Sequence, residues 1–293
     1  MKNEFLEYIK NEKMYSSNTY STYERIIDEY TSFLKKEGIQ ETDITIQVIR
    51  GYLRTLYDNK YSSKSMCLYI SALRSYHKFL LKKKIITSNP MSLIKNPKLE
   101  KRNPKFLNYN DLDSIYDAID KTSPLGIRDN LIIELFYSTG VRVSELVNIK
   151  LEDINEFDMT IRILGKGNKE RIVLYGETLK EKLNLYLNKV REKLKKENSD
   201  YLLFNKNGTK LTDRGVRKII DKIVKKTTLN EKISPHIIRH TFATHLLKEG
   251  ADLRMVQELL GHSSLAATQV YTHITNEQLR NVYLKTHPRA KEK

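Results

Sequence analysis

The sequence predicts a mainly α-helical chain with one small antiparallel β-sheet, divided into two domains. Three observations support this fold class. Apolar residues recur at helical spacing along most of the 293 residues. Only two short segments, 159–164 and 170–175, alternate like strands, and the turn sequence GKGNK joins them. A segment rich in proline and lysine, 88–106, separates an N-terminal domain (1–87) from a C-terminal domain (107–293).

Four helices account for the N-terminal domain, because apolar side chains repeat on one face of each segment. They are expected at residues 3–13, 18–37, 43–57 and 63–83. The fourth helix also carries a polar and basic stripe in steps of three, four and seven: Lys64, Ser71, Ser75, Lys78 and Lys82. Such a stripe suits a helix lying against a DNA groove, with an ordinary solvated face as the alternative. Lys64, Ser71 and Lys78 are therefore candidate DNA-binding residues.

The C-terminal domain begins with a helix capped near Asn110 and Asp111. A second helix, 126–139, is expected to end at Gly140, a residue type that favours helix C-termini. Thr275 and Gln278 form a capping box for the last helix, which has an apolar edge. Further helices are expected at 144–149, 177–196, 212–226, 235–249, 252–260, 264–270 and 276–285.

The net charge indicates a polyanionic partner. Lys and Arg number 52 against 36 Asp and Glu, a balance of +16. This charge alone does not separate DNA, RNA and anionic membrane. The single cysteine, Cys67, excludes a disulfide framework, and no apolar run is long enough to span a membrane. The N-terminal segment carries acidic residues and does not read as a signal peptide, so a cytoplasmic protein is expected.

Residue types that could take part in catalysis are concentrated towards the C-terminal end. In SPHIIRHTFATH, Ser234 is expected to cap a helix and Pro235 to take its first position. His236 and Arg239 then share one face of the first turn, where backbone N–H groups and the helix dipole favour a phosphate. Taken alone, such a pair is more often a surface His and Arg near a cap.

Four further residues complete the candidate site. Arg142 follows a helix-ending glycine in STGVRVSEL, and Lys166 belongs to the GKGNK turn. His262 follows a second helix-ending glycine, and Tyr271 comes nine residues later, in QVYTH. Each has an ordinary alternative: Lys166 as a charged turn residue, for example, and Tyr271 as one of eighteen tyrosines packed in the core.

Together these residue types suit phosphoryl transfer. Two arginines can fork onto the non-bridging oxygens of a phosphodiester and stabilise the charge of its transition state. A tyrosine hydroxyl can attack phosphorus, a histidine can take its proton, and a lysine can protonate the leaving 5′-oxygen. The sequence has no cluster of Asp and Glu at metal-holding spacing, so neither a metal nor another cofactor is expected.

In this order and within these motifs, the six residues resemble the active site of the tyrosine recombinases, the phage-integrase-like family, and above all its Xer type. STGVRVSEL, GKGNKER, SPHIIRHTFATHLL and LLGHSSLAATQVYTH carry the resemblance, which covers essentially the whole chain. It implies a helical, SAM-like DNA-binding domain followed by a catalytic domain. It also implies a site-specific recombinase that works through a Holliday junction and resolves chromosome or plasmid dimers during chromosome partition.

The resemblance assigns a role to each residue. Arg142 and Arg239 would clamp the scissile phosphate, and Glu145 would support the fold of the active site. Lys166 would be the general acid.

The remaining roles concern the nucleophile and its helpers. His236 would act as general base or hydrogen-bond partner, and His262 would bind the phosphate. Tyr271 would form a 3′-phosphotyrosyl link and release a 5′-hydroxyl, so that strands rejoin without ATP.

The resemblance also implies partners. These are double-stranded DNA with paired half-sites and a tetramer on two duplexes, built from one chain or shared with a paralogue. Helix 276–285 would dock on a neighbouring subunit, with packing on its own domain as the alternative. The resemblance also allows a septal DNA translocase as a partner. The helix beginning LTDRGVRK would lie in the major groove, with Arg214, Arg217 and Lys218 as contacts or as solvated side chains.

Four other functions remain as alternatives. The chain could be the integrase or transposase of a mobile element, a topoisomerase that cuts one strand, or a DNA-binding protein without catalysis. It could also be a zinc enzyme that uses His236, His240 and His245, although Arg239 among them would repel a cation.

Overall fold

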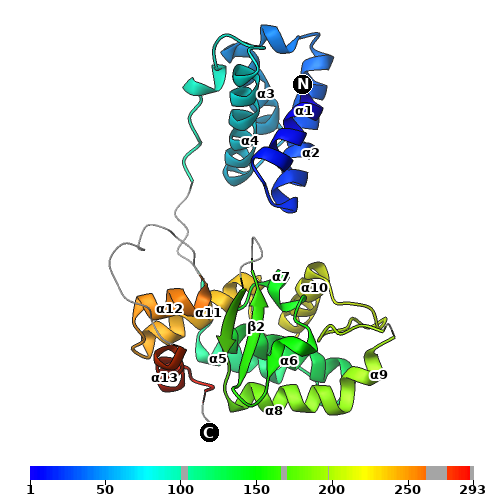
Figure 1. Cartoon of the computed structure of the whole chain (residues 1–293), viewed down its shortest axis with the longest axis vertical. Helices are drawn as coiled ribbons and strands as arrows, with labels where there is room; N and C mark the ends of the chain where they lie inside the picture. Colours follow the sequence, from blue (N-terminus) through cyan, green and yellow to red (C-terminus); the bar gives the residue numbers. More distant parts are fainter. Residues whose placement is uncertain (100–104, 166–169, 197, 262–275, 291–293) are drawn as a thin grey trace. The chain divides into compact units, whose positions relative to one another are not determined.

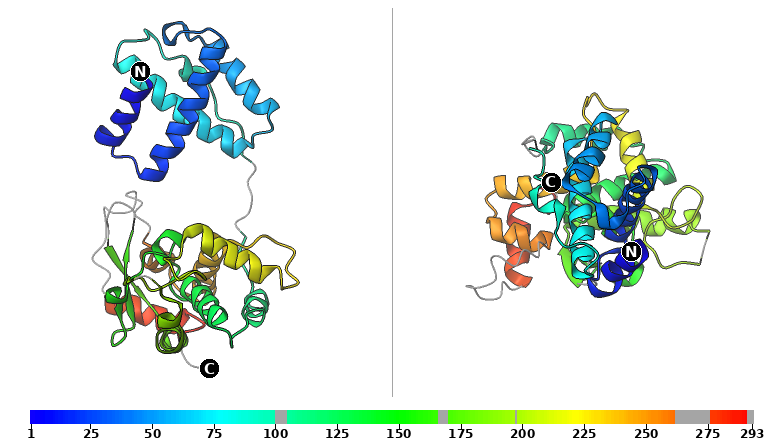
Figure 2. Two further views of the ribbon diagram at one scale, coloured as in Figure 1. Left: turned by 90° about the vertical axis from the view of Figure 1, so that its right-hand side faces the viewer. Right: turned by 90° about the horizontal axis from the view of Figure 1, so that it is seen from above.

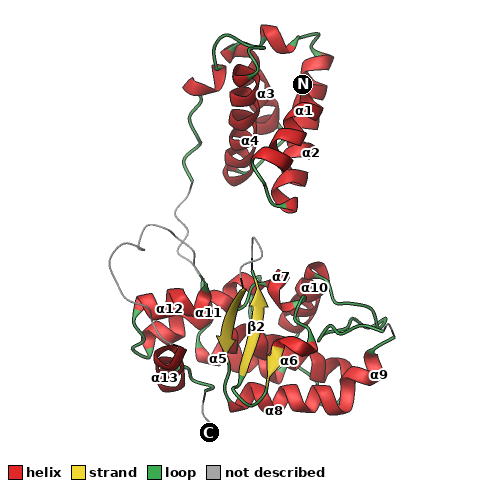
Figure 3. Ribbon diagram, viewed as in Figure 1, coloured by secondary structure: helices red, strands yellow, loops and turns green. Residues whose placement is uncertain are grey.

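The computed structural model describes residues 1–99, 105–165, 170–196, 198–261 and 276–290. The chain forms two compact units, Met1–Arg102 and Asn103–Lys293 (Figure 1). The predicted class, mainly helical with one small antiparallel sheet, is confirmed (Figure 3). Among the described helices, none has the length and apolar character needed to span a bilayer.

The first unit contains the four helices predicted near the N-terminus. Hydroxyl side chains fix three of its helix starts, since Ser16, Thr45 and Ser62 each accept a hydrogen bond from the backbone N–H three residues later. The helices enclose a core rich in aromatic residues, with Tyr30 and Tyr76 fully buried. Their bounds are α1 Lys2–Glu7, which continues as a π-helix Tyr8–Glu12, α2 Ser17–Lys36, α3 Ile46–Asp58 and α4 Ser63–Lys82.

The segment predicted as a linker is partly folded onto the units at its two ends. Its first part forms a short 3₁₀ helix, Pro90–Leu93, and buries Met91 and Ile94 in the core of the first unit. At its other end, Lys105 forms a 2.6 Å ion pair with Glu231 of the second unit. Proline content therefore does not show how much of this segment packs.

The second unit contains the remaining helices. They are α5 Tyr109–Asp117, α6 Pro124–Thr139, α7 Val143–Leu146, α8 Glu177–Tyr186, α9 Glu192–Leu194, α10 Asp213–Val224, α11 Pro235–Lys248, α12 Leu253–Leu260 and α13 Asn276–Thr286. The predicted cap near Asn110 is wrong, because Asn108 and Asp111 form the capping box of α5. The predicted helix 264–270 lies outside the described residues.

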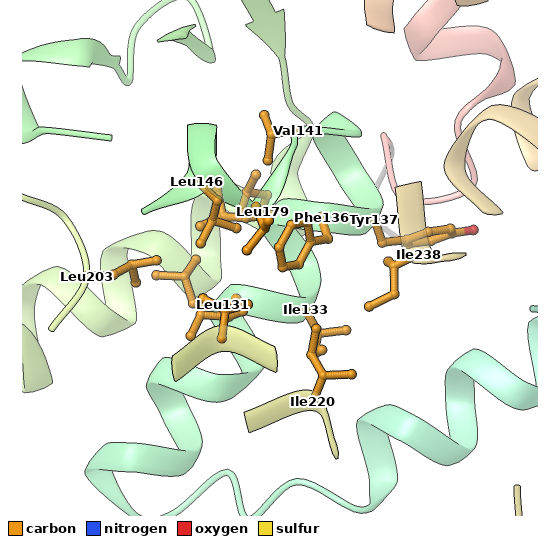
Figure 4. Close-up of a cluster of buried hydrophobic side chains, with 14 of the residues drawn as sticks. Leu131, Ile133, Phe136, Tyr137, Val141, Leu146, Leu179, Leu203, Ile220 and Ile238 are labelled. Carbon is orange, nitrogen blue, oxygen red and sulfur yellow. The ribbon is translucent and has the colours of Figure 1, made fainter. Parts of the chain in front are cut away.

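Helix α6 is the centre of the second unit. It is apolar on all sides, which is typical of a helix enclosed by others, and Leu131, Ile133 and Phe136 have no exposed surface. Helices α8 and α11 pack against it (Figure 2). Its side chains interlock with Leu179 and Ile238 from those two helices (Figure 4). The end of α6 is therefore held rigidly, and the candidate site begins there.

The sheet has three antiparallel strands in the order β1-β2-β3. They are β1 Ile154–Asn155, β2 Thr160–Leu164 and β3 Glu170–Leu174. Strands β2 and β3 were predicted, whereas β1 is too short to give an alternating pattern. Ile163 pairs with Arg171 in the register, and Ile163 is buried. Since paired residues point to the same face, Arg171 lies on the buried face of the sheet.

Candidate active site

Arg142 is fixed at the junction between α6 and α7. Gly140 ends α6 with a left-handed φ of +60°, and a Cβ there would come 2.6 Å from the Phe242 ring. The backbone N–H of Arg142 then donates to Glu145 Oε2 at 2.7 Å, and its Nη1 donates to Oε1 at 2.7 Å. The side chain of Arg142 stays 39% exposed, so its guanidinium is oriented and still accessible.

Arg239 lies in the first turn of α11. Ser234 and Pro235 occupy the predicted N-cap and first positions, although the Ser234 side chain makes no cap hydrogen bond. The Arg239 guanidinium is buried and donates to two backbone carbonyls, Gly140 O and Leu260 O, the latter at 2.7 Å. One side chain thus joins the end of α6, the start of α11 and the end of α12.

Three of the predicted motifs therefore converge. Gly140 stands two residues before Arg142, and Leu260 stands two residues before His262. His236 is exposed on the same first turn of α11 as Arg239. Residues separated by more than a hundred positions in the sequence meet because the carbonyl ends of α6 and α12 both accept from Arg239.

The electrostatics of this convergence favour an anion. Burial, and then repulsion from Arg142, lower the pKa of Arg239 to about 10, while Glu145 acts in the opposite direction. Arg239 stays protonated near neutral pH, so two cations remain close together in a partly dry site. A bound phosphate diester would relieve their repulsion and accept their hydrogen bonds.

Glu145 connects Arg142 to a residue that the sequence analysis missed. Arg171 Nη1 and Nη2 donate to the two Glu145 oxygens at 2.8 Å each. Burial alone would raise the pKa of Glu145, but the hydrogen bonds from Arg171 and Arg142 outweigh it and hold the pKa at about 2. An arginine on the inner face of the alternating segment ERIVLY was the signal that could have identified Arg171.

Comparison with known proteins agrees with this geometry. Residues 105–278 match the model of the phage integrase family, and residues 3–84 match the phage integrase N-terminal SAM-like domain. The chain belongs to the phage integrase family. A tyrosine recombinase, the function class predicted from the sequence, is thereby confirmed.

The recombinase has similar proteins across its full length. It is 46% identical to tyrosine recombinase XerC of Anoxybacillus flavithermus, over 98% of this chain and 97% of that protein. It is 44% identical to the XerC of Bacillus subtilis, over 99% and 96%. The crystal structure of XerA recombinase is 29% identical, with a TM-score of 0.51 over 98% of each chain. XerH bound to its difH substrate shares the fold at 24% identity and a TM-score of 0.68, over 97% of this chain and 84% of XerH.

Three predicted catalytic residues of the recombinase lie outside the described residues. They are Lys166, His262 and Tyr271. Lys166 falls in the sequence between β2 and β3, and His262 directly follows Gly261, the left-handed C-cap of α12. Their assignments stay predictions.

The predicted DNA-binding residues are all exposed. On α10, Arg214, Arg217 and Lys218 are exposed, and the opposite face of that helix buries Val216 and Ile220.

On α4 of the first unit, Lys64, Ser71 and Lys78 are exposed as well, and Ser71 Oγ lies 3.2 Å from the Tyr23 hydroxyl. Exposure of these residues fits contact with a duplex.

The described part of the recombinase holds no group of three or more His, Cys, Asp or Glu side chains placed to bind a metal. His245, part of the zinc alternative, is a packing residue. Its ring lies 4.2 Å from the Tyr109 ring, and its Nδ1 lies 2.9 Å from the Tyr137 hydroxyl.

Proposed function

We propose that this recombinase cuts and rejoins DNA at a specific site, with Arg142 and Arg239 holding the scissile phosphate. The observation that carries the proposal is the convergence of these two guanidiniums. Arg142 is the N-cap residue of α7 and Arg239 lies on α11. Arg239 donates to the carbonyl of Gly140, two residues before Arg142, and Arg142 pairs with Glu145. Such a pair is suited to the non-bridging oxygens of a phosphodiester.

The two guanidiniums act most strongly on the transition state. When a nucleophile attacks phosphorus, negative charge grows on the equatorial oxygens, and donors that are already oriented stabilise it without reorganisation. Arg239 is oriented by two backbone carbonyls, and Arg142 by Glu145. Neither needs to move when the charge develops.

Tyr271 supplies the nucleophile in this proposal. Its oxygen forms a bond to phosphorus as the P–O5′ bond breaks, so the strand keeps a 3′-phosphotyrosyl end and releases a 5′-hydroxyl. His236 takes the tyrosine proton, Lys166 gives a proton to the 5′-oxygen, and His262 hydrogen-bonds the phosphate. A 5′-hydroxyl from a partner strand attacks the phosphotyrosyl link and releases Tyr271, so the strands rejoin without ATP.

The proposed assembly is a tetramer on two duplexes, formed by this chain alone or with a paralogue. Exchange of strands passes through a Holliday junction and resolves chromosome or plasmid dimers on the nucleoid, in the cytoplasm. The proposal includes transfer of α13 to a neighbouring subunit in the assembly, and leaves a septal DNA translocase as a candidate partner. In this single chain, α13 packs against α11, and Tyr283 of α13 and Phe242 of α11 belong to the same buried cluster.

A covalent trap tests the chemistry. The probe is a near-palindromic duplex of about 28 base pairs, chosen by footprinting, with half-sites about one helical turn apart. A nick a few nucleotides to the 3′ side of the scissile phosphate frees the short fragment that bears the new 5′-hydroxyl. Because this fragment diffuses away, rejoining stops and the cleaved complex accumulates as a protein–DNA adduct. The wild-type chain is expected to form this adduct equally with and without a chelator. Tyr271→Phe should form none, whereas Tyr57→Phe, at an exposed tyrosine of the first unit, should behave as wild type.

Two results would overturn the proposal. An adduct that persists in Tyr271→Phe would remove the nucleophile assignment. An adduct that disappears with chelator would favour metal-dependent cleavage.

A further inference from the structure

Arg171 is a partly buried cation on the strand that follows the predicted general acid. It lies on β3, five residues after Lys166, on the inner face of the sheet, with a side chain only 15% exposed. Arg162 on β2 offers a contrast, since its side chain is 48% exposed and pairs with Asp153 and Glu170 at the surface. Turning an arginine inward is costly unless a fixed counter-charge accepts hydrogen bonds from its guanidinium group.

The partner of Arg171 is fully engaged. Glu145 Oε1 accepts from Nη1 of Arg142 and from Nη1 of Arg171, and Oε2 accepts from the Arg142 backbone and from Nη2 of Arg171. A carboxylate offers about four acceptor positions, so these four donors fill it. Among the described residues, the side chain of Arg142 therefore reaches Glu145 through Nη1 alone.

The other guanidinium nitrogens of Arg142 are therefore available to an anion. If Arg171 were absent, the Glu145 carboxylate would be buried with half of its acceptor positions unfilled. Arg142 is the nearest cation and could turn its second nitrogen to the carboxylate, making the bidentate pair that arginine and carboxylate prefer. The same turn would take that nitrogen away from the phosphate.

Arg171 also packs against the end of α12. Gly261 has a left-handed φ of +63°, and a Cβ there would come 2.5 Å from Arg171 Cδ and 2.9 Å from its Nε. The side chain of Arg171 therefore lies directly beneath the residue that precedes His262. One arginine contacts both the turn that carries Arg142 and the helix end that leads to His262.

We propose that Arg171 is a positioning residue of the strand-cleavage reaction: it saturates Glu145, so that Glu145 orients Arg142 without withdrawing it from the scissile phosphate. This inference rests on the proposed function, because it assumes that Arg142 binds the phosphate. It gives Arg171 no contact with DNA. Its role is to determine how many guanidinium nitrogens of Arg142 can donate hydrogen bonds to the phosphate.

The test is a rescue by a second substitution. Arg171→Ala should leave the affinity for the duplex within about threefold and lower the rate of adduct formation about 100-fold, the cost of a misplaced catalytic group. Glu145→Gln removes the charge that would capture Arg142, so the double variant Arg171→Ala/Glu145→Gln should regain at least about tenfold over Arg171→Ala. Arg171→Lys, which keeps the charge but loses the fork, should resemble Arg171→Ala. Arg162→Ala is the matched control and should cleave at the wild-type rate.

The opposite results are equally clear. Wild-type cleavage by Arg171→Ala, or a double variant no faster than Arg171→Ala, overturns the inference. The second result would mean that Arg171 only stabilises the fold, and the melting temperatures of the variants would show the same loss.

A binding measurement separates this inference from the proposed function. Inorganic phosphate at constant ionic strength should raise the melting temperature of the wild-type chain. Arg171→Ala should reduce this rise, and the added Glu145→Gln should restore it. If the wild-type chain shows this pattern but never forms an adduct, the proposed function fails. What stands is that Arg171 keeps Arg142 available to a phosphate. If phosphate stabilises Arg171→Ala as well as wild type, the role of Arg171 fails.

Discussion

Arg289 Nη1 lies 3.1 Å from Oε2 of Glu134, a carboxylate with no exposed surface. Glu134 also accepts from Lys182 of α8 and, at 2.7 Å, from Ser138. The Arg289 guanidinium stands 4.1 Å above the Tyr116 ring. The segment that follows α13 is therefore fastened to α6, the helix whose end positions Arg142. The C-terminal segment and the active site depend on the same helix.

Removing the charge of Glu134 should destabilise the second unit strongly. Burial raises the pKa of Glu134, but Lys182 and Arg289 outweigh it and keep the pKa below its usual value. Glu134→Gln would leave two partly buried cations, Lys182 and Arg289, without their counter-charge. Removing one partner of a buried ion pair typically costs about 3–5 kcal/mol. Urea unfolding measures this loss.

A surface carboxylate provides the control for that experiment. Glu177 pairs with Lys180 at 3.6 Å and is 38% exposed, so Glu177→Gln should change the stability by less than about 1 kcal/mol. Equal effects of the two substitutions would contradict the central place of Glu134.

Acid should loosen the C-terminal segment through His287. Its Nε2–H donates to Tyr137 O at 3.0 Å, and its Nδ1 accepts from the Arg289 backbone N–H at 3.1 Å, so the neutral ring uses both nitrogens. Burial lowers its pKa from 6.5 to about 4. The unfolded chain therefore binds a proton at a higher pH than the folded chain does. Stability falls as the pH drops from about 6.5 towards 4, by roughly 3 kcal/mol in full, and is constant above that window.

Hydrogen exchange of residues 276–290 as a function of pH measures this effect. His287→Phe should remove the slope in this segment while leaving a slope in the first unit, because burial also lowers the pKa of His77 to about 4. A slope in 276–290 that survives His287→Phe would assign the effect to other groups.

Much of this architecture could be predicted from the sequence. Capping residues and periodic apolar positions located most helices, and Gly140 ended α6 as expected. The pattern could not show β1, because two residues carry no alternation, or the π-helix Leu187–Arg191 that joins α8 to α9. Those features depend on packing with neighbours.

The candidate site divides in the same way. Arg142 and Arg239 could be found from local motifs, since each stands beside a helix end. Arg171 could not be found in this way, because its partner Glu145 is 26 positions away and only the folded arrangement of β3 and α7 brings the two together. A long-range ion pair leaves no periodic signal, apart from the unusual placement of a charge on an inward face.

Gly261→Ala should impair cleavage more than stability. The left-handed φ of +63° costs a residue with a Cβ about 1 kcal/mol, and the new methyl group would press on Arg171. Gly38→Ala is a matched control, because Gly38 has a φ of +68° and a Cβ added there would have nothing within 4 Å. Both variants should lose similar stability in thermal unfolding, and only Gly261→Ala should slow adduct formation. Equal rates for the two would show that the contact with Arg171 is readily relieved.

The basic face of α10 should account for part of the salt dependence of DNA binding. Arg217 and Lys218 are exposed on the face opposite the buried Val216. If each side chain neutralises one phosphate, its replacement by Ala should reduce the magnitude of the slope of log K against log salt by about 0.9. The reason is that the counterions condensed on that phosphate are no longer released on binding. Lys180→Ala on α8, where the lysine already pairs with Glu177, should leave the slope unchanged. Titrations at several salt concentrations measure the slope. Unchanged slopes for both α10 variants would mean that the duplex contacts another face of the recombinase.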